Sequence, residues 1–159
     1  MAHSDLPDGF LKHPVHFCAL GFGSGLTPRA PGTAGTLVGL LIFFILQSLP
    51  VVWYAAIVSL VCAFGIIICA VTARSLGVND HPAIVWDEIA GILVTLLWVP
   101  SGWVWIVLGF VLFRGFDILK PWPISLVDRR VTGGLGIMLD DLIAGIFSLI
   151  CLQLIHYLL

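Results

Sequence analysis

Residues 98–103 read WVPSGW, and this short stretch decides how the chain folds. It lies within a run from Ile89 to Phe113 that contains no charged residue, so the run is either one long apolar helix or two shorter ones. Proline and glycine together break helices, and tryptophan favours the boundary between membrane and water. Because tryptophans lie on both sides of the break, the sequence predicts that the chain turns back here.

The turn predicts a helical hairpin over residues 82–99 and 103–119. A second uncharged run, residues 30–73, is interrupted by QSLP and predicts helices over 33–49 and 51–73. About 20 helical residues span the hydrocarbon core of a bilayer. The chain of 159 residues is 60% hydrophobic and 10% charged, which is far more apolar than an ordinary soluble domain. We therefore expect an integral membrane protein.

The last helix is predicted to start at Asp140 or Asp141 and to run to about Leu158. The expected fold is all-α, an integral membrane bundle of about five membrane helices: two hairpins plus a C-terminal helix, with charged loops on one face. Residues 1–13 show neither an apolar period nor the pattern of a signal peptide. We expect them to form a loose tail before a single membrane-embedded domain over residues 14–159.

Both predicted hairpins return the chain to the same side of the membrane. That side carries Arg29, Arg74 and the charged segment 114–130, whereas the opposite turns carry no charge. Positive residues favour the cytoplasmic side, so we expect a multi-pass protein whose charged face is cytoplasmic. The net charge of -2 gives no electrostatic support for binding nucleic acid.

Two predicted helix starts resemble each other, IVWDEIAGI at residues 84–92 and IMLDDLIAGI at residues 137–146. In both, Ala and Gly follow an acid by three and four residues, and small residues at helical spacing let helix backbones pack closely in a membrane. Asp87 and Asp141 are therefore predicted to face each other at one end of two parallel helices. A single span over the run that contains WVPSGW would instead place them on opposite sides of the bilayer.

Acids gathered in this way repel one another unless a cation lies between them. Hard carboxylate oxygens suit Mg²⁺, which also accepts phosphate oxygens. The alternative is that these acids only favour helix N-termini at the membrane edge. Two matching pairs favour a functional site, because ionisable groups beside membrane helices are usually functional. The predicted metal ligands are Asp87, Glu88, Asp140 and Asp141, and the candidate catalytic residues are these four together with Asp117.

Arg114, Asp117 and Lys120 lie on one face of a predicted helix. They form either a salt-bridged helix end or a site in which the arginine and the lysine bind a phosphate. The glycine-rich stretch GFGSGLTPRAPGTAG, residues 21–35, has two interpretations as well. It is a short helix with a turn, or a phosphate cradle completed by Arg29 and Thr33, with Thr33 capping a helix. It lacks the Lys-Ser/Thr ending of a P-loop.

Other phosphatase chemistries find no support in the sequence. No cysteine is followed six residues later by arginine, no Asp-x-Asp pair occurs, and no paired histidines are present. His81 is the histidine nearest to the acids, and it is either a proton donor or a structural residue of its loop. The four cysteines have no metal-binding spacing.

Four blocks of sequence resemble the bacterial phosphatidylglycerophosphatase A family of membrane phosphatases. They are GFGSGLTPRAPGTAGT from Gly21, GVNDHPAIVWDEIAG from Gly77, FRGFDILKPWPI from Phe113 and GGLGIMLDDLIAG from Gly133. The resemblance implies an all-helical protein of the bacterial cytoplasmic (inner) membrane. It also implies Mg²⁺-dependent hydrolysis of phosphatidylglycerophosphate to phosphatidylglycerol and phosphate, in phospholipid biosynthesis. The residues to which it points are Asp87, Glu88, Arg114, Asp117, Lys120, Asp140 and Asp141.

Two rival functions remain open at this point. The first is a phosphatase for another lipid phosphate, and the second is a divalent-cation transporter lined by acids. A CDP-alcohol phosphotransferase would need a DG-x₂-AR motif, which the sequence lacks. Neither the number of metal ions, nor the attacking nucleophile, nor the oligomeric state follows from the sequence.

Overall fold

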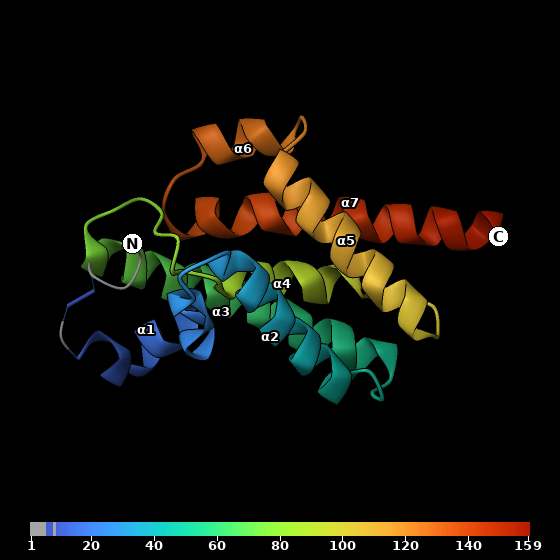
Figure 1. Ribbon diagram of the computed structural model, residues 1–159, viewed down its shortest axis with the longest axis horizontal. Helices are drawn as coiled ribbons and strands as arrows, with labels where there is room; N and C mark the ends of the chain where they lie inside the picture. The colour runs from blue at the N-terminus through green and yellow to red at the C-terminus, as the bar shows by residue number, and fades with distance from the viewer. Residues whose placement is uncertain (1–5, 8) are drawn as a thin grey trace.

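The structure is a computed structural model that describes residues 6–7 and 9–159. Over those residues it contains helices and no strand, which confirms the predicted all-α fold (Figure 1). The long helices are α2 (Pro31–Leu46), α3 (Val51–Leu76), α5 (Trp103–Leu119) and α7 (Gly133–Leu158). The shorter elements are η1 (Phe10–Lys12), α1 (Pro14–Ala19), η2 (Gly21–Leu26), α4 (Trp86–Thr95) and α6 (Ile124–Arg130).

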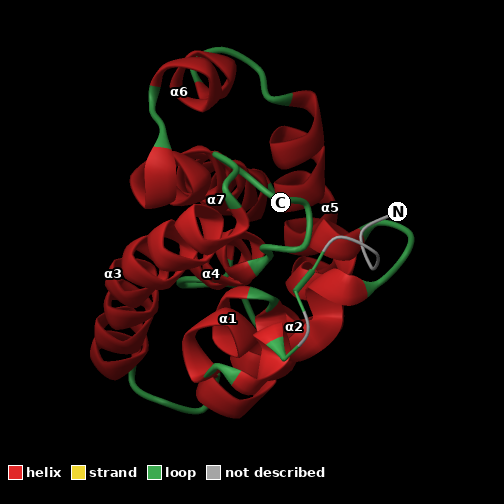
Figure 2. Cartoon of the chain, turned by 90° about the vertical axis from the view of Figure 1, so that its left-hand side faces the viewer, coloured by secondary structure: helices red, strands yellow, loops and turns green. Residues whose placement is uncertain are grey.

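Helix α4 lies at the centre of the molecule and packs against α2, α3, α5 and α7 (Figure 2). Its sequence, WDEIAGILVT, is apolar on every side after the two acids, which is the pattern of a helix buried all round. Ile89, Ile92 and Leu93 have no exposed surface. The acids at its start are therefore held by a rigid, fully packed element.

Glycines bring the helices close to α4. A Cβ atom on Gly145 of α7 would lie 2.6 Å from the carbonyl oxygen of Gly91, and one on Gly39 of α2 would lie 3.1 Å from that of Ile89. Both distances are shorter than van der Waals contact, so only glycine permits these crossings. The structure thus confirms the predicted close packing of the two Ala-Gly motifs.

The predicted turn at WVPSGW is confirmed. Helix α4 ends at Thr95, α5 begins at Trp103, and both Trp98 (φ 59°) and Gly102 (φ 120°) adopt left-handed backbone conformations between them. The Gln153 side chain of α7 donates a hydrogen bond to the Trp98 carbonyl at 2.8 Å. Helix α4 is shorter than the expected helix over 82–99, because residues before Trp86 form a loop in which the Val85 N–H donates to Ala19 at 3.0 Å.

Helix α7 begins at Gly133, several residues before the predicted start at Asp140 or Asp141. The prediction was wrong because the glycine-rich stretch before the acids resembles a loop. In the structure it is a close packing surface, since a Cβ atom on Gly134 would lie 2.0 Å from the Ile66 carbonyl of α3. The two acids are consequently beyond the first two turns of α7 and away from the positive end of its dipole.

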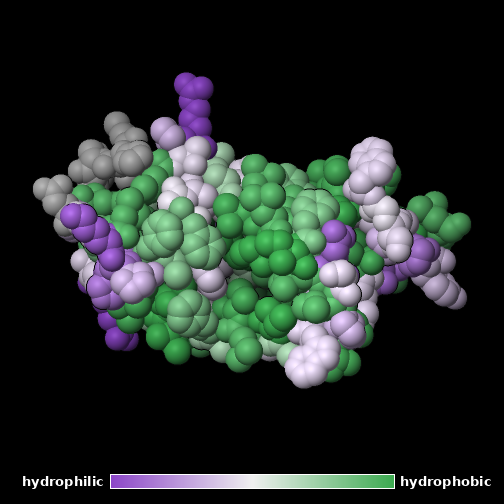
Figure 3. Space-filling view, turned by 90° about the horizontal axis from the view of Figure 1, so that it is seen from below, coloured by the Kyte–Doolittle hydropathy of each residue, from purple (hydrophilic) through white to green (hydrophobic). Residues whose placement is uncertain are grey.

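Helices α3 and α7, each of 26 residues, are long and apolar enough to cross a membrane, and α2 is a shorter apolar helix. The five-span bundle stays a prediction. Figure 3 shows a mostly hydrophobic middle with hydrophilic residues gathered toward the ends of the molecule. Of the predicted tail, residues 1–5 and 8 lie outside the described residues, whereas the Phe10 ring stacks on His16 with centroids 4.0 Å apart.

Candidate active site

A cavity of about 350 Å³ opens at the end of the molecule away from the WVPSGW turn. We call it the carboxylate cavity. It lies where the first turns of α2 and α4 meet the last turns of α5 and the acids of α7. Its lining residues are Ala30, Pro31, Gly32, Asp80, Pro82, Ile84, Asp87, Glu88, Arg114, Asp117, Ile118, Lys120, Asp140 and Asp141.

Three acids converge in this cavity, and we call them the acidic cluster: Asp87 and Glu88 from the first turn of α4, and Asp141 from α7. One carboxylate oxygen of each lies within 4.8 Å of those of the other two. Asp87 and Asp141 face each other, and four residues further on Gly91 meets Gly145, so the two helices run in the same direction as predicted.

Each acid of the cluster has a buried carboxylate oxygen with no hydrogen-bond partner among the described residues. Asp141 is only 3% exposed. Buried carboxylates without partners are energetically unfavourable, and their mutual repulsion adds to this. A divalent cation would satisfy all three, and a set made only of carboxylate oxygens fits Mg²⁺. The residues present are therefore consistent with the expected metal.

Arg114 of α5 brings positive charge to the edge of the acidic cluster. Its Nη1 atom lies 2.5 Å from the Asp117 carboxylate, 3.8 Å from the Glu88 carboxylate and 3.5 Å from the Thr36 hydroxyl of α2. The side chain is 15% exposed, and its buried Nε atom has no partner among the described residues. Arg114 thus lines the cavity and retains a donor that no described residue uses.

Helix α2 reaches the cavity through Gly32, in its first turn. A Cβ atom on Gly32 would lie 2.1 Å from Oε1 of Glu88 and 3.1 Å from Nη1 of Arg114. Any larger residue would displace one of these two side chains. The backbone of α2 therefore fixes the spacing of Glu88 and Arg114 from one side, while Asp117 holds Arg114 from the other.

Lys120 is the C-terminal cap of α5. The sequence suggested that it binds a phosphate together with Arg114, whereas in the structure its ammonium contacts two carboxylates. Its Nζ atom lies 2.5 Å from Asp128 of α6 and 2.6 Å from Asp140 of α7, and we call these three residues the lysine clamp. Partial burial alone would lower the pKa of Lys120, but its hydrogen bonds to the two acids outweigh this and raise the pKa above its ordinary value. Asp140 lines the cavity, yet its charge is balanced by Lys120 and it is not part of the acidic cluster.

The glycine-rich stretch contributes less to the cavity than expected. Only its part at residues 30–32 lines the cavity, and Arg29 is exposed just before it. Thr33 does not cap α2, because the helix begins at Pro31 and Ala30 is its N-cap with no side-chain hydrogen bond. His81 lies beside the cavity, where its Nδ1 accepts a hydrogen bond from the Ala83 N–H at 3.2 Å, as a structural loop residue does.

Three polar or charged residues at or near the cavity were not among the predicted site residues: Asp80, Thr36 and Asp128. Thr36 is completely buried and contacts Arg114, and a signal for it existed, because it lies among the helically spaced glycines of α2 that pack on α4. Asp128 of the lysine clamp gave no such signal, since its proximity to Lys120 depends on helix α6, which the sequence did not predict.

Comparison with known proteins shows the family to which the chain belongs. A sequence profile for phosphatidylglycerophosphatase A matches residues 17–156. The chain belongs to this family. It is 45% identical to phosphatidylglycerophosphatase A of Escherichia coli strain K12, over 92% of this chain and 87% of that protein. The Haemophilus influenzae protein of the same name is also 45% identical, over 92% of this chain and 91% of that protein.

A third relative, from Bacteroides thetaiotaomicron, is provisionally named phosphatidylinositol-3-phosphatase and is 37% identical over 86% of this chain and 90% of that protein. No solved structure matches the chain. All the residues to which the family resemblance pointed line the carboxylate cavity: Asp87, Glu88, Arg114, Asp117, Lys120, Asp140 and Asp141. The structure therefore brings these residues together around one space.

Proposed function

We propose that this protein hydrolyses phosphatidylglycerophosphate to phosphatidylglycerol and inorganic phosphate in the carboxylate cavity, as a step of phospholipid biosynthesis. The observation that carries this proposal is the pairing of unpartnered acids with an arginine that has an unused donor. This pairing offers sites for a cation and for an anion side by side. The family membership supplies the substrate class.

The acidic cluster is the proposed Mg²⁺ site, held by Asp87, Glu88 and Asp141. A bound Mg²⁺ would supply Lewis-acid polarisation of a phosphate oxygen. Asp140, which the sequence placed in the metal site, is instead proposed to position Asp141 from its place beside Lys120.

Arg114 is the proposed phosphate-binding residue. Its guanidinium would neutralise the charge that develops on the phosphate oxygens, while its ion pair with Asp117 keeps it directed into the cavity. In the reaction, a water oxygen bonds to phosphorus, the bond from phosphorus to the glycerol oxygen breaks, and the glycerol oxygen leaves as a hydroxyl. The carboxylates of the cavity are the groups able to accept the proton that water gives up and to return a proton to the glycerol oxygen as it leaves.

The proposed setting is the bacterial cytoplasmic membrane, crossed several times, with the carboxylate cavity on the cytoplasmic side. Support comes from the two long apolar helices and from exposed tryptophans at the end opposite the cavity, where Trp53, Trp98 and Trp103 are 62–74% exposed. Arg129 and Arg130 are exposed at the cavity end, as the excess of positive residues on a cytoplasmic face requires.

The decisive experiment measures phosphate release by the purified protein in mixed micelles from defined lipid phosphates, with Mg²⁺ and then with a chelator. We expect release from phosphatidylglycerophosphate with Mg²⁺ and none with chelator. Failure to release phosphate from this lipid would overturn the proposal. Preference for a phosphoinositide would favour the activity named for the Bacteroides relative, and cation flux into liposomes without hydrolysis would favour a transporter.

A further inference from the structure

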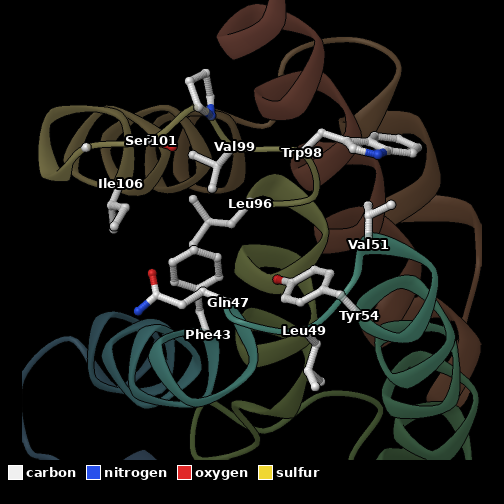
Figure 4. A pocket seen from close by; sticks show the side chains of 12 residues that line it. Phe43, Gln47, Leu49, Val51, Tyr54, Leu96, Trp98, Val99, Ser101 and Ile106 are labelled. Carbon is white, nitrogen blue, oxygen red and sulfur yellow. The ribbon is translucent and has the colours of Figure 1, made fainter.

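The proposed reaction needs a proton for the glycerol oxygen as it leaves, and a positioned side chain can supply it by general acid catalysis. The cavity of about 240 Å³ beside the WVPSGW turn has no carboxylate, histidine, lysine or arginine among its lining residues (Figure 4). Its one tyrosine, Tyr54, already donates a hydrogen bond to the Leu93 carbonyl at 2.8 Å. The carboxylate cavity, by contrast, has six acids among its lining residues.

One of these six acids has no role so far. The other five belong to the acidic cluster or are paired with Arg114 or Lys120: Asp87, Glu88, Asp117, Asp140 and Asp141. The sixth is Asp80, which forms no ion pair with any described residue. Lys120 also lines the cavity, but its hydrogen bonds to two acids raise its pKa, so it keeps its proton.

Asp80 lies at the mouth of the carboxylate cavity. Four of the lining residues are exposed, and they border its opening: Ala30, Asp80, Pro82 and Ile118. The acidic cluster lies deeper, since each of its acids has a buried carboxylate oxygen. A terminal phosphate bound between the acidic cluster and Arg114 directs its glycerol oxygen toward the mouth, because the rest of the lipid must leave the cavity there. Asp80 is the one acid among the four residues at the mouth.

Asp80 also lines a second cavity, of about 230 Å³, which includes no residue of the acidic cluster. Asp80 and Asp140 are the two residues common to both cavities, so they form part of the wall between them. The other charged residues that line the second cavity are Asp128 and Arg129 of α6. Water in this second cavity can therefore reach Asp80 from outside the carboxylate cavity and replace a proton that it gives away.

The surroundings of Asp80 favour its protonated form. Although the residue is exposed, the protein around its carboxyl removes water from it, and this desolvation raises the pKa of Asp80 above its ordinary value. Lys120 and His81 oppose the shift, whereas Asp128 adds to it. A carboxyl with a raised pKa keeps its proton closer to neutral pH, which a general acid requires.

We propose that Asp80 is the general acid of the reaction and donates its proton to the glycerol oxygen. As the water oxygen bonds to phosphorus, the bond from phosphorus to the glycerol oxygen breaks, and the proton of Asp80 makes that oxygen a hydroxyl. The Asp80 carboxylate then takes up, through solvent, the proton that the attacking water gave up. This inference rests on the proposed function and adds to it the residue that protonates the leaving group.

The test changes the atom that needs the proton. In a phosphatidylglycerophosphate with sulfur in place of the glycerol oxygen at the scissile bond, a thiolate leaves, and thiols lose their protons far more readily than alcohols. Asp80→Asn should lower kcat for the ordinary oxygen lipid roughly a hundredfold, the lower end of what general acid catalysis contributes, with little change in KM. For the sulfur lipid, kcat of this variant should stay close to that of the unmodified protein.

Asn79→Ala is the matched control, because Asn79 is the preceding residue of the same exposed loop and does not line the carboxylate cavity. It should hydrolyse both lipids as the unmodified protein does. Thermal unfolding shows that Asp80→Asn is folded, and added Mg²⁺ should still raise its Tm, because Asp80 is not part of the acidic cluster. If Asp80→Asn shows no thermal transition, Asp80→Ser is measured in its place.

An equal loss on the oxygen and sulfur lipids, an equal loss in Asn79→Ala, or the loss of stabilisation by Mg²⁺ overturns the assignment of Asp80. If the unmodified protein cleaves only the oxygen lipid, the pH profile decides. Its kcat should fall as the pH rises through the pKa of Asp80, because the carboxyl then has no proton to donate. The same fall in Asp80→Asn contradicts the proposal. If the unmodified protein releases phosphate from neither lipid, the proposed function itself is wrong.

Discussion

The acidic cluster lines the carboxylate cavity and the lysine clamp reaches it through Lys120 and Asp140, yet the two differ in how their charges are balanced. In the clamp, Lys120 lies between two carboxylates at 2.5 and 2.6 Å. In the acidic cluster, the nearest described cation is Arg114, at 3.8 Å from Glu88, and each acid keeps a buried oxygen without a partner. The clamp contains its own cation, whereas the described residues place no cation in direct contact with Asp87 or Asp141 of the acidic cluster. Residues of the same type therefore have different roles according to their partners.

The largest expected effect comes from changing the acidic cluster. Asp87→Asn or Asp141→Asn should lower phosphate release roughly a hundredfold or more, since even residues that only support metal ligands contribute 10–100-fold. Without Mg²⁺ the variants should be at least as stable as the unmodified protein, because each removes a buried charge that has no partner. Added Mg²⁺ should raise the Tm of the unmodified protein, by preferential binding to the folded state, but not that of the variants.

Thermal unfolding with and without Mg²⁺ measures this second effect without reference to activity. The control is Asp128→Asn, which removes a carboxylate from the lysine clamp and should leave the stabilisation by Mg²⁺ intact. If Mg²⁺ stabilises Asp141→Asn as much as the unmodified protein, the acidic cluster is not the metal site.

We expect a smaller loss of activity from a substitution in α2 at the point where this helix contacts the active site. Gly32→Ala should reduce kcat/KM roughly tenfold, because its Cβ would lie 2.1 Å from Oε1 of Glu88 and a shift of about 1 Å at a reacting group can reduce the rate a hundredfold. Gly115→Ala on α5 is the matched control, since a Cβ there would meet nothing within 4 Å. The assay is phosphate release at saturating Mg²⁺. Equal activity of the two variants would show that α2 does not set the position of Glu88.

The sequence predicted the fold well where a local pattern and the tertiary packing agree. The WVPSGW turn carries a helix-breaking pair and interfacial tryptophans, and the predicted helix over 103–119 has the bounds of α5. Gly91 and Gly145 were expected to meet because small residues at helical spacing have few uses in a membrane helix other than close packing. Asp87 and Asp141 came together as a consequence of that packing.

Where tertiary packing overrides the local sequence pattern, the predictions made from the sequence were wrong. Glycines normally disfavour helices, so the start of α7 resembled a loop, although Gly134 is helical and packs against the Ile66 carbonyl. The position of Lys120 could not be foreseen either. Its spacing from Arg114 indicated a shared helix face, but Lys120 has a left-handed backbone conformation (φ 42°) that ends α5. Its ammonium therefore meets Asp128 on α6.

The smallest expected effects on stability and activity come from the lysine clamp, in which the two carboxylates, Asp128 and Asp140, are expected to contribute differently. The Asp128 side chain is 42% exposed, and exposed ion pairs contribute at most about 1 kcal/mol. Asp128→Asn should therefore lower the free energy of unfolding by less than that amount and change kcat/KM less than about fivefold. Because the two acids raise the pKa of Lys120, the contribution of the lysine charge to stability is present at neutral pH and is lost as the pH rises above the ordinary pKa of lysine and through the raised one.

Lys120→Met should have a larger effect than Asp128→Asn, because it leaves Asp140 without its cation. The Asp140 side chain is only 10% exposed, and a buried polar group that loses its partner costs about 1–3 kcal/mol. Denaturant unfolding of the two variants measures the difference. If Lys120→Met is no more destabilising than Asp128→Asn, then Asp140 does not depend on Lys120, and the contrast between a paired clamp and an unpaired acidic cluster fails. Asp140 would then be free to join Asp87, Glu88 and Asp141 at the proposed metal site, as the sequence predicted.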